Sequence, residues 1–121
     1  MATKILNRPL WIVSIEHKLS PKHLEYYYII KFISELDGDI VTTYVSDSNR
    51  NFKNWQTVID DFINNKQAIR LQGLFPVKKT KKPTATPIIN ADAKFQVMGD
   101  TVDLDSFMNT VAETFYPEIL S

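Results

Sequence analysis

The sequence predicts a mainly β domain with five strands in the order β-β-β-α-β-β, arranged as a small, partly open barrel, and an additional C-terminal helix. Three observations support this prediction. Five segments are rich in aromatic and β-branched side chains, which favour strands. One segment between the third and fourth of them spaces its apolar residues at helical intervals, and a second such stripe follows the last strand. The 121 residues suffice for one hydrophobic core and are too few for two.

Turn-forming residues bound the strands. The strands are predicted at residues 10–16, 25–36, 39–46, 68–77 and 88–98. Pro21 separates the first from the second, and the Asp37-Gly38 pair favours a tight hairpin turn between the second and the third. Gly73 predicts a bulge or a sharp bend within the fourth strand, and Gly99-Asp100 is predicted to end the fifth.

Two segments have the periodicity of amphipathic helices. The stripe of the first consists of Phe52, Trp55, Val58, Ile59, Phe62 and Ile63. Candidate N-caps for it are Asp47, Ser48, Asn49 and Asn51, and the Asn64-Asn65 pair is predicted to end it. The second helix is predicted to begin at the N-cap Asp103 and to end before Pro117. Its stripe consists of Leu104, Phe107, Met108, Val111 and Phe115.

A single helix between the third and fourth strands is the element order of the OB-fold, a five-stranded, partly open barrel. Such barrels bind oligonucleotides or oligosaccharides on the face of strands 2 and 3 and with the loops between strands 1 and 2 and between strands 4 and 5. In this chain the first of those loops is residues 17–24 (HKLSPKHL), and the second is residues 77–87 (VKKTKKPTATP). We call residues 77–87 the lysine loop.

These features resemble those of the small OB-fold single-stranded DNA-binding proteins of phages, particularly of lactococcal phages. The resemblance covers the chain's size, the element order over residues 8–99, Trp11 at the opening of the first strand, the YYYIIKF strand and the lysine loop. It implies sequence-independent binding of single-stranded DNA in phage replication or recombination, in the cytoplasm of the host cell. It also implies a homo-oligomer, dimer or tetramer, and contacts with phage replication or recombination proteins.

Basic and aromatic side chains are the candidate binding residues, because basic groups follow phosphates and aromatic rings stack on bases. The basic candidates are Lys18, Lys22, Lys31, Arg70, Lys78, Lys79, Lys81 and Lys82. The aromatic candidates are Trp11, Tyr26, Tyr27, Tyr28 and Tyr44. Successive strand residues face opposite sides, so at least one of the three adjacent tyrosines must be exposed, and the sequence leaves open which ones. Trp11 fits a core position equally well.

Charge divides the chain into two parts. Residues 1–99 contain all fourteen Lys and Arg and nine acidic residues, for a net charge of +5. Residues 100–121 contain five acidic residues and no basic one, for a net charge of −5. We therefore expect a nucleic-acid-binding domain at 1–99 and an acidic amphipathic helix or tail at 100–121. The apolar stripe of the tail favours packing on the barrel or on a second subunit over a mobile tail.

Other classes of function are disfavoured. The chain has no cysteine, and its three glycines form no phosphate-binding loop, so we expect neither an enzyme nor a cofactor. His17 and His23 lack further ligands, which makes a metal site improbable. No apolar run is long enough for a membrane span and the N-terminus does not resemble a signal peptide, so a cytoplasmic protein is expected.

Two alternatives remain open. The lysine loop is compatible with a plain solvated turn, because runs of charge commonly serve only to solvate a surface. The chain also fits an OB-like protein–protein interaction module that binds a partner with its groove and C-terminal helix. The clustered lysines argue against that second function, because lysine is depleted at the centre of protein interfaces.

Overall fold

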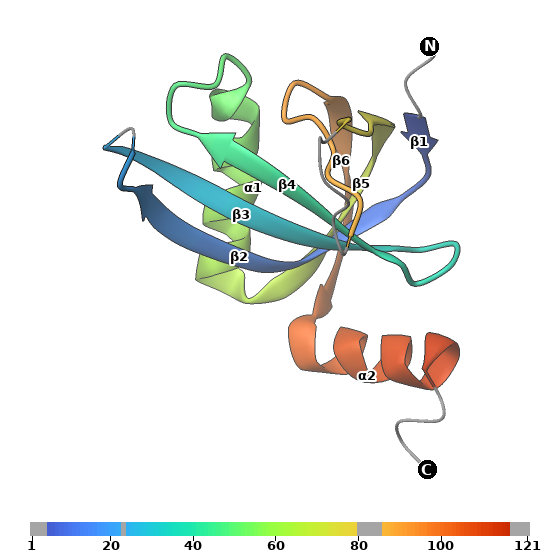
Figure 1. The fold of residues 1–121 in the computed structure, drawn as a ribbon. Coiled ribbons are helices and arrows are strands. Elements are labelled where there is room, and N and C mark those ends of the chain that lie inside the picture. Colours follow the sequence, from blue (N-terminus) through green and yellow to red (C-terminus); the bar gives the residue numbers. More distant parts are fainter. Residues whose placement is uncertain (1–4, 23, 80–85, 117–121) are drawn as a thin grey trace.

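The computed structural model describes residues 5–22, 24–79 and 86–116 of the chain. These residues form a mainly antiparallel β-sheet and two helices (Figure 1). The strands are β1 (Ile5–Asn7), β2 (Leu10–Ser20), β3 (Glu25–Ser34), β4 (Ile40–Ser46), β5 (Gln67–Pro76) and β6 (Lys94–Asp103). The helices are α1 (Phe52–Asn65) and α2 (Leu104–Phe115). The prediction of a mainly β chain with one internal and one C-terminal helix is confirmed.

β5 links the parts of the sheet, because it pairs with other strands along both of its edges. One edge of β5 pairs with β2 and then with β1 in a single continuous register, and β6 pairs along its other edge. β3 and β4 continue from β2, so the neighbour order is β1-β5-β2-β3-β4, with β6 also beside β5. β3 and β4 form the predicted hairpin, but β3 ends at Ser34, and residues 35–39 make a longer connection than the tight turn predicted at Asp37-Gly38.

β2 is longer than predicted. Residues 17–20, expected in a loop, pair with residues 25–28 of β3 and extend the strand to Ser20. The strand ends immediately before Pro21, which has no N–H to offer a ladder hydrogen bond. The loop prediction for residues 17–20 is therefore wrong, because pairing with the tyrosine-rich strand outweighs the weak strand propensity of this polar segment.

The last strand begins later than predicted. Ile88 and Ile89 form only isolated bridges, one to Thr42 and one to Val77. A turn follows, in which the Asn90 side chain accepts a hydrogen bond from the Asp92 N–H (2.9 Å). Such a side-chain-to-backbone turn competes with the sheet ladder, so β6 starts only after it.

The strand end expected at Gly99-Asp100 is also wrong, and the bulge considered at Gly73 is absent from the β5–β6 pairing. β6 does not end at Gly99, which lies within it with φ = +81°. The irregularity in the β5–β6 pairing lies between Ile69 and Leu71 rather than at Gly73. Gly73 instead permits a close approach of β6, because a Cβ there would lie 2.3 Å from the Lys94 carbonyl oxygen.

The core lies between α1 and the inner face of the sheet. From α1 the buried residues are Trp55, Val58, Ile59 and Phe62. The strands contribute buried apolar side chains that include Leu10, Ile12, Ile30, Phe32, Val41, Val45, Leu71 and Phe75. The helix ends at Asn65, as predicted, and Lys66 takes up the left-handed conformation and donates its N–H to the Phe62 carbonyl.

α2 packs against the end of the sheet where the β3–β4 turn lies. Asp103 caps the helix as predicted, with its carboxylate accepting from the Ser106 N–H (3.2 Å). Val111 is buried, and the Phe107 ring lies 4.7 Å from that of Trp11. Met108, predicted to share this packed stripe, is exposed instead.

The C-terminal end of α2 contacts the β3–β4 turn. A Cβ on Gly38 would lie 2.4 Å from Cγ of Phe115, and the φ of +76° at Gly38 also favours glycine. The Tyr116 hydroxyl donates to the Gly38 carbonyl (2.8 Å). Neither of the described helices is long and apolar enough to cross a membrane.

Candidate functional site

The alternation of side chains along β3 defines the two faces of the sheet. Ile30 and Phe32 are fully buried and point into the core. Tyr27, Ile29 and Lys31 therefore point to the outer face, away from α1. The expectation that at least one of the three adjacent tyrosines is exposed is confirmed by Tyr26 (51%), whereas the parity places the half-buried Tyr27 on the outer face.

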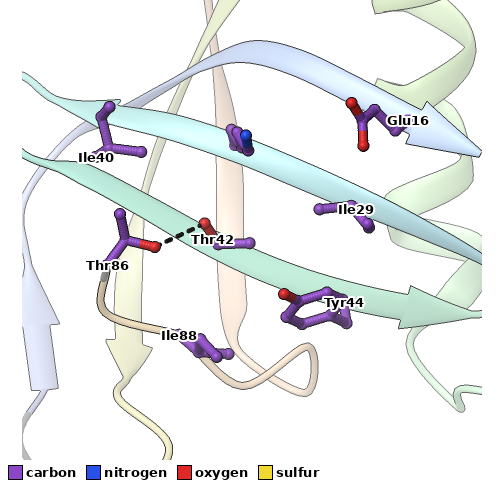
Figure 2. Close-up of a pocket in the computed structure, with 8 residues that line it drawn as sticks. Glu16, Ile29, Ile40, Thr42, Tyr44, Thr86 and Ile88 are labelled. Atoms are coloured by element: carbon purple, nitrogen blue, oxygen red, sulfur yellow. Dashed lines mark hydrogen bonds between the residues drawn. The ribbon is translucent and has the colours of Figure 1, made fainter. Parts of the chain in front are cut away.

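The outer face of β2, β3 and β4 carries a hollow of about 430 Å³ (Figure 2). Its position follows from the strand register, in which Ile29 lies beside Glu16 on one side and Tyr44 on the other. We call it the outer hollow. It is lined by Glu16, Ile29, Lys31, Ile40, Thr42, Tyr44, Thr86 and Ile88.

Residues 86–89, which comprise the last two residues of the lysine loop and the two that follow it, form one wall of the outer hollow. The Thr42 and Thr86 hydroxyls lie 3.1 Å apart, as the dashed line in Figure 2 shows. The backbone of Thr42 receives from the Ile89 N–H and donates to the Pro87 carbonyl, both at 2.9 Å, in a parallel bridge. The wall is therefore attached to β4 by several hydrogen bonds.

The start of α1 holds the segment that follows this wall, residues 91–93. The buried Trp55 indole N–H donates to the Ala91 carbonyl (2.8 Å). The Asn51 amide donates to the carbonyls of Ala91 and Ala93, both at 3.1 Å. Asn51 is the N-cap residue, yet its side chain makes no capping hydrogen bond and binds this segment instead.

The outer hollow combines exposed aromatic and aliphatic surface with one basic and one acidic side chain, Lys31 and Glu16. Tyr44 is 44% exposed and Ile40 42% exposed. The ring of Tyr27 lies 6.4 Å from that of Tyr44 and extends the aromatic surface beyond the hollow. Lys31 supplies the positive charge, and Glu16 forms a weak ion pair with Lys18 (3.7 Å), its neighbour along the same face of β2.

The predicted basic residues are only partly brought together. Lys31 lies in the outer hollow and Lys18 beside it, while Lys22 is exposed in the turn after β2. Lys78 and Lys79 border a different hollow, which they share with Ile5, Pro76, Val77 and Asn90. The Lys78 N–H donates to the Ile88 carbonyl (2.7 Å), so this lysine is next to the wall. Lys81 and Lys82 lie outside the described residues.

Arg70 and Trp11 lie away from the outer hollow, beside α2. The Arg70 guanidinium donates to both carboxylate oxygens of Glu35 (2.9 and 3.0 Å), and the Trp11 indole N–H donates to one of them (3.2 Å). The hydrogen bonds from Arg70 hold the pKa of Glu35 below its ordinary value. Trp11 is only 9% exposed, so it occupies the core position that the sequence allowed.

Tyr26 and Tyr28 lie on the face opposite to Tyr27. Tyr28 stacks on His17, with ring centroids 4.3 Å apart and planes 8° apart. Burial, followed by the charges of Asp47 and Asp60, raises the pKa of the Tyr28 hydroxyl. Tyr26 is 51% exposed and lies 5.0 Å from the same His17 ring. These two tyrosines therefore cannot contribute to the outer hollow.

Several residues that line the outer hollow were not predicted from the sequence: Glu16, Ile29, Ile40, Thr42, Thr86 and Ile88. The strand alternation could have found those in β3 and β4, because fixing Ile30 and Phe32 as core residues places their sequence neighbours outside. No local pattern indicated that residues 86–88 pair with β4.

Among the described residues, no three His, Asp or Glu side chains gather as a metal site would require. His23 lies outside those residues. No family model, curated protein or solved structure matches the chain.

Proposed function

We propose that this chain is an OB-type barrel that binds single-stranded DNA, without sequence preference, across the outer hollow. The observation that carries the proposal is the placement of tyrosine rings and lysines on one face: the half-buried Tyr27 and the exposed Tyr44 with Lys18 and Lys31. Rings that are free to stack on bases, next to cations that can contact phosphates, are the two components of non-specific single-strand binding.

The strand order and the parallel bridge support an OB-type barrel. β2 pairs with both β3 and β5, and the single helix α1 stands between β4 and β5. The bridge between Thr42 and Ile88 attaches the segment before β6 to the outer edge of β4. A DNA strand lying across β2, β3 and β4 would use the face on which OB barrels bind oligonucleotides.

The biological setting belongs to the same proposal. Action in phage DNA replication or recombination, in the host cytoplasm and as a dimer or tetramer, rests on the resemblance of the sequence to phage single-stranded DNA-binding proteins.

A second candidate is a groove for an extended peptide. Three isoleucines, Ile29, Ile40 and Ile88, line the outer hollow. Within the described residues, the outer edge of β4 is bridged only at Thr42, which leaves backbone groups that an added strand could use. A peptide bound in this way is held by backbone hydrogen bonds and apolar contacts rather than by phosphate contacts. The salt dependence of DNA binding therefore separates the two candidates.

A salt titration of binding to oligothymidylate tests the proposal. We expect the logarithm of the binding constant to fall against the logarithm of salt concentration with a slope of roughly −0.7 per contacted phosphate. Alanine at Lys18 and Lys31, the two lysines of the outer face, should flatten this slope. Alanine at Lys53 and Lys66, at the two ends of α1 on the opposite side of the sheet, is the matched control and should leave it nearly unchanged.

Duplex DNA of equal length should bind much more weakly than the single strand, because paired bases cannot stack on the tyrosines. A flat salt response, or equal affinity for single and double strands, would contradict the proposed function.

A further inference from the structure

A row of aromatic rings lies on the reverse face of the β2–β3 ribbon, away from the outer hollow. It runs from Tyr26 through His17 and Tyr28 to Phe52 at the start of α1. Tyr28 and Phe52 are half-buried and pack against the core. His17 is exposed and Tyr26 is 51% exposed, so the outer end of the row is open to a ligand.

The chain holds these two outer rings in place by strand pairing rather than by core packing. His17 lies directly opposite Tyr28, and Leu19 directly opposite Tyr26. The His17 ring is almost parallel to that of Tyr28, at 8°, so its orientation is fixed by stacking. An aromatic surface with a fixed orientation and an exposed end is suited to stacking on a nucleobase, because every base presents a π-face.

The row and the outer hollow are separated only by the thickness of the ribbon. Lys18 and Tyr27 pair with each other and point to the outer face, whereas their sequence neighbours His17 and Tyr26 point to the reverse face. Beyond Ile12, no other described strand lies along the outer edge of β2. That edge is therefore the shortest route from one face to the other.

Charge favours the edge of β2 over the side of the row that faces β4. Asp47 and Asp60 act electrostatically on Tyr28, and the Asp47 N–H donates to the Tyr26 carbonyl (3.3 Å), so negative charge would repel a phosphate on the β4 side of the row. Lys18 lies at the free edge of β2 and Lys22 is exposed in the turn beyond it. A DNA backbone could follow these two lysines around the edge.

We propose that a single strand bound in the outer hollow continues over the free edge of β2 and stacks a base on Tyr26 and His17. This inference rests on the proposed function and assigns the protein a second stacking site on the reverse face. It predicts that part of the affinity depends on oligonucleotide length.

The experiment compares two labelled oligothymidylates by fluorescence anisotropy: one of about 6 nucleotides, which fills the outer hollow only, and one of about 16 nucleotides, which can reach both faces. Tyr26→Ala should weaken binding of the long strand roughly fivefold or more, since one stacked base is lost, and leave the short strand unchanged. Tyr26→Phe keeps the ring and should restore the long-strand affinity.

Leu19→Ala is the matched control, because Leu19 lies opposite Tyr26 on the same face and has a similar exposure of 48%. It should change neither affinity. The inference is overturned if Tyr26→Ala affects both strands equally or neither, or if Leu19→Ala reproduces its effect. Tyr44→Ala separates a failure of the second stacking site from a failure of the proposed function. If Tyr44→Ala weakens binding of both oligonucleotides while Tyr26→Ala weakens binding of neither, only the second site is wrong. If the unchanged protein binds neither strand, the proposed function is wrong as well.

Discussion

Replacing Phe107 and Val111 of α2 together by alanine is expected to lower the free energy of unfolding by about 3 kcal/mol. Val111 is buried against the end of the sheet, and the half-buried Phe107 packs on Trp11 at 4.7 Å. Burial of an apolar side chain contributes roughly 1.5–3 kcal/mol when complete, so one full and one partial loss sum to about this value. Equilibrium denaturation followed by circular dichroism measures the change.

Met108→Ala is the matched control for that pair. Met108 lies on the same helix, next to Phe107, but is 40% exposed. Its truncation should cost well under 1 kcal/mol. If the double variant were no less stable than Met108→Ala, α2 would not pack on the sheet in solution, and a mobile acidic tail would be the better description of residues 104–121.

Replacing both Tyr27 and Tyr44 by alanine is expected to weaken binding of oligothymidylate by about 30-fold or more. Each ring offers a stacking surface on the outer face, and stacking contributes roughly 1–3 kcal/mol per base. The two rings lie 6.4 Å apart, close enough to serve successive parts of one strand. Fluorescence anisotropy at constant salt measures the loss.

The pair Tyr27→Phe and Tyr44→Phe is the control, because it keeps both rings and removes only the hydroxyls. These variants should bind nearly as well as the unchanged protein. Thermal melting of the alanine pair establishes that the fold is retained. Undiminished binding by a folded alanine pair would mean that these tyrosines do not stack on bases.

Local patterns in the sequence predicted much of the fold. The spacing from Phe52 to Ile63 identified α1, and Asp103 identified the start of α2, because capping and helical periodicity act over a few residues. The Asp37-Gly38 pair indicated the β3–β4 hairpin for the same reason, although the connection is longer than a tight turn. The ends of β2 and β6 were misjudged because they depend on pairing with strands that are distant in the sequence or on an Asx-type turn.

The candidate site was less predictable than the fold. Lys31, Tyr27 and Tyr44 were identified by residue type, but their common face became evident only once Ile30 and Phe32 were known to be buried. Arg70 and Trp11 have the right chemistry for DNA binding, yet Glu35 binds both of them beside α2. Glu35 lies 24 residues from Trp11 and 35 from Arg70 in the sequence, and no local pattern indicates such a contact.

An NMR titration of the isotope-labelled protein with oligothymidylate tests the central claim most directly, because it locates the bound strand residue by residue. We expect the largest amide shift changes at Glu16, Ile29, Lys31, Thr42, Tyr44 and Ile88, which line the outer hollow. Amides of α1, on the opposite side of the sheet, should change little (Figure 1). Saturable binding with shifts confined to other surfaces, such as the hollow around Ile5 and Lys79, would contradict the assignment of the outer face as the DNA-binding surface.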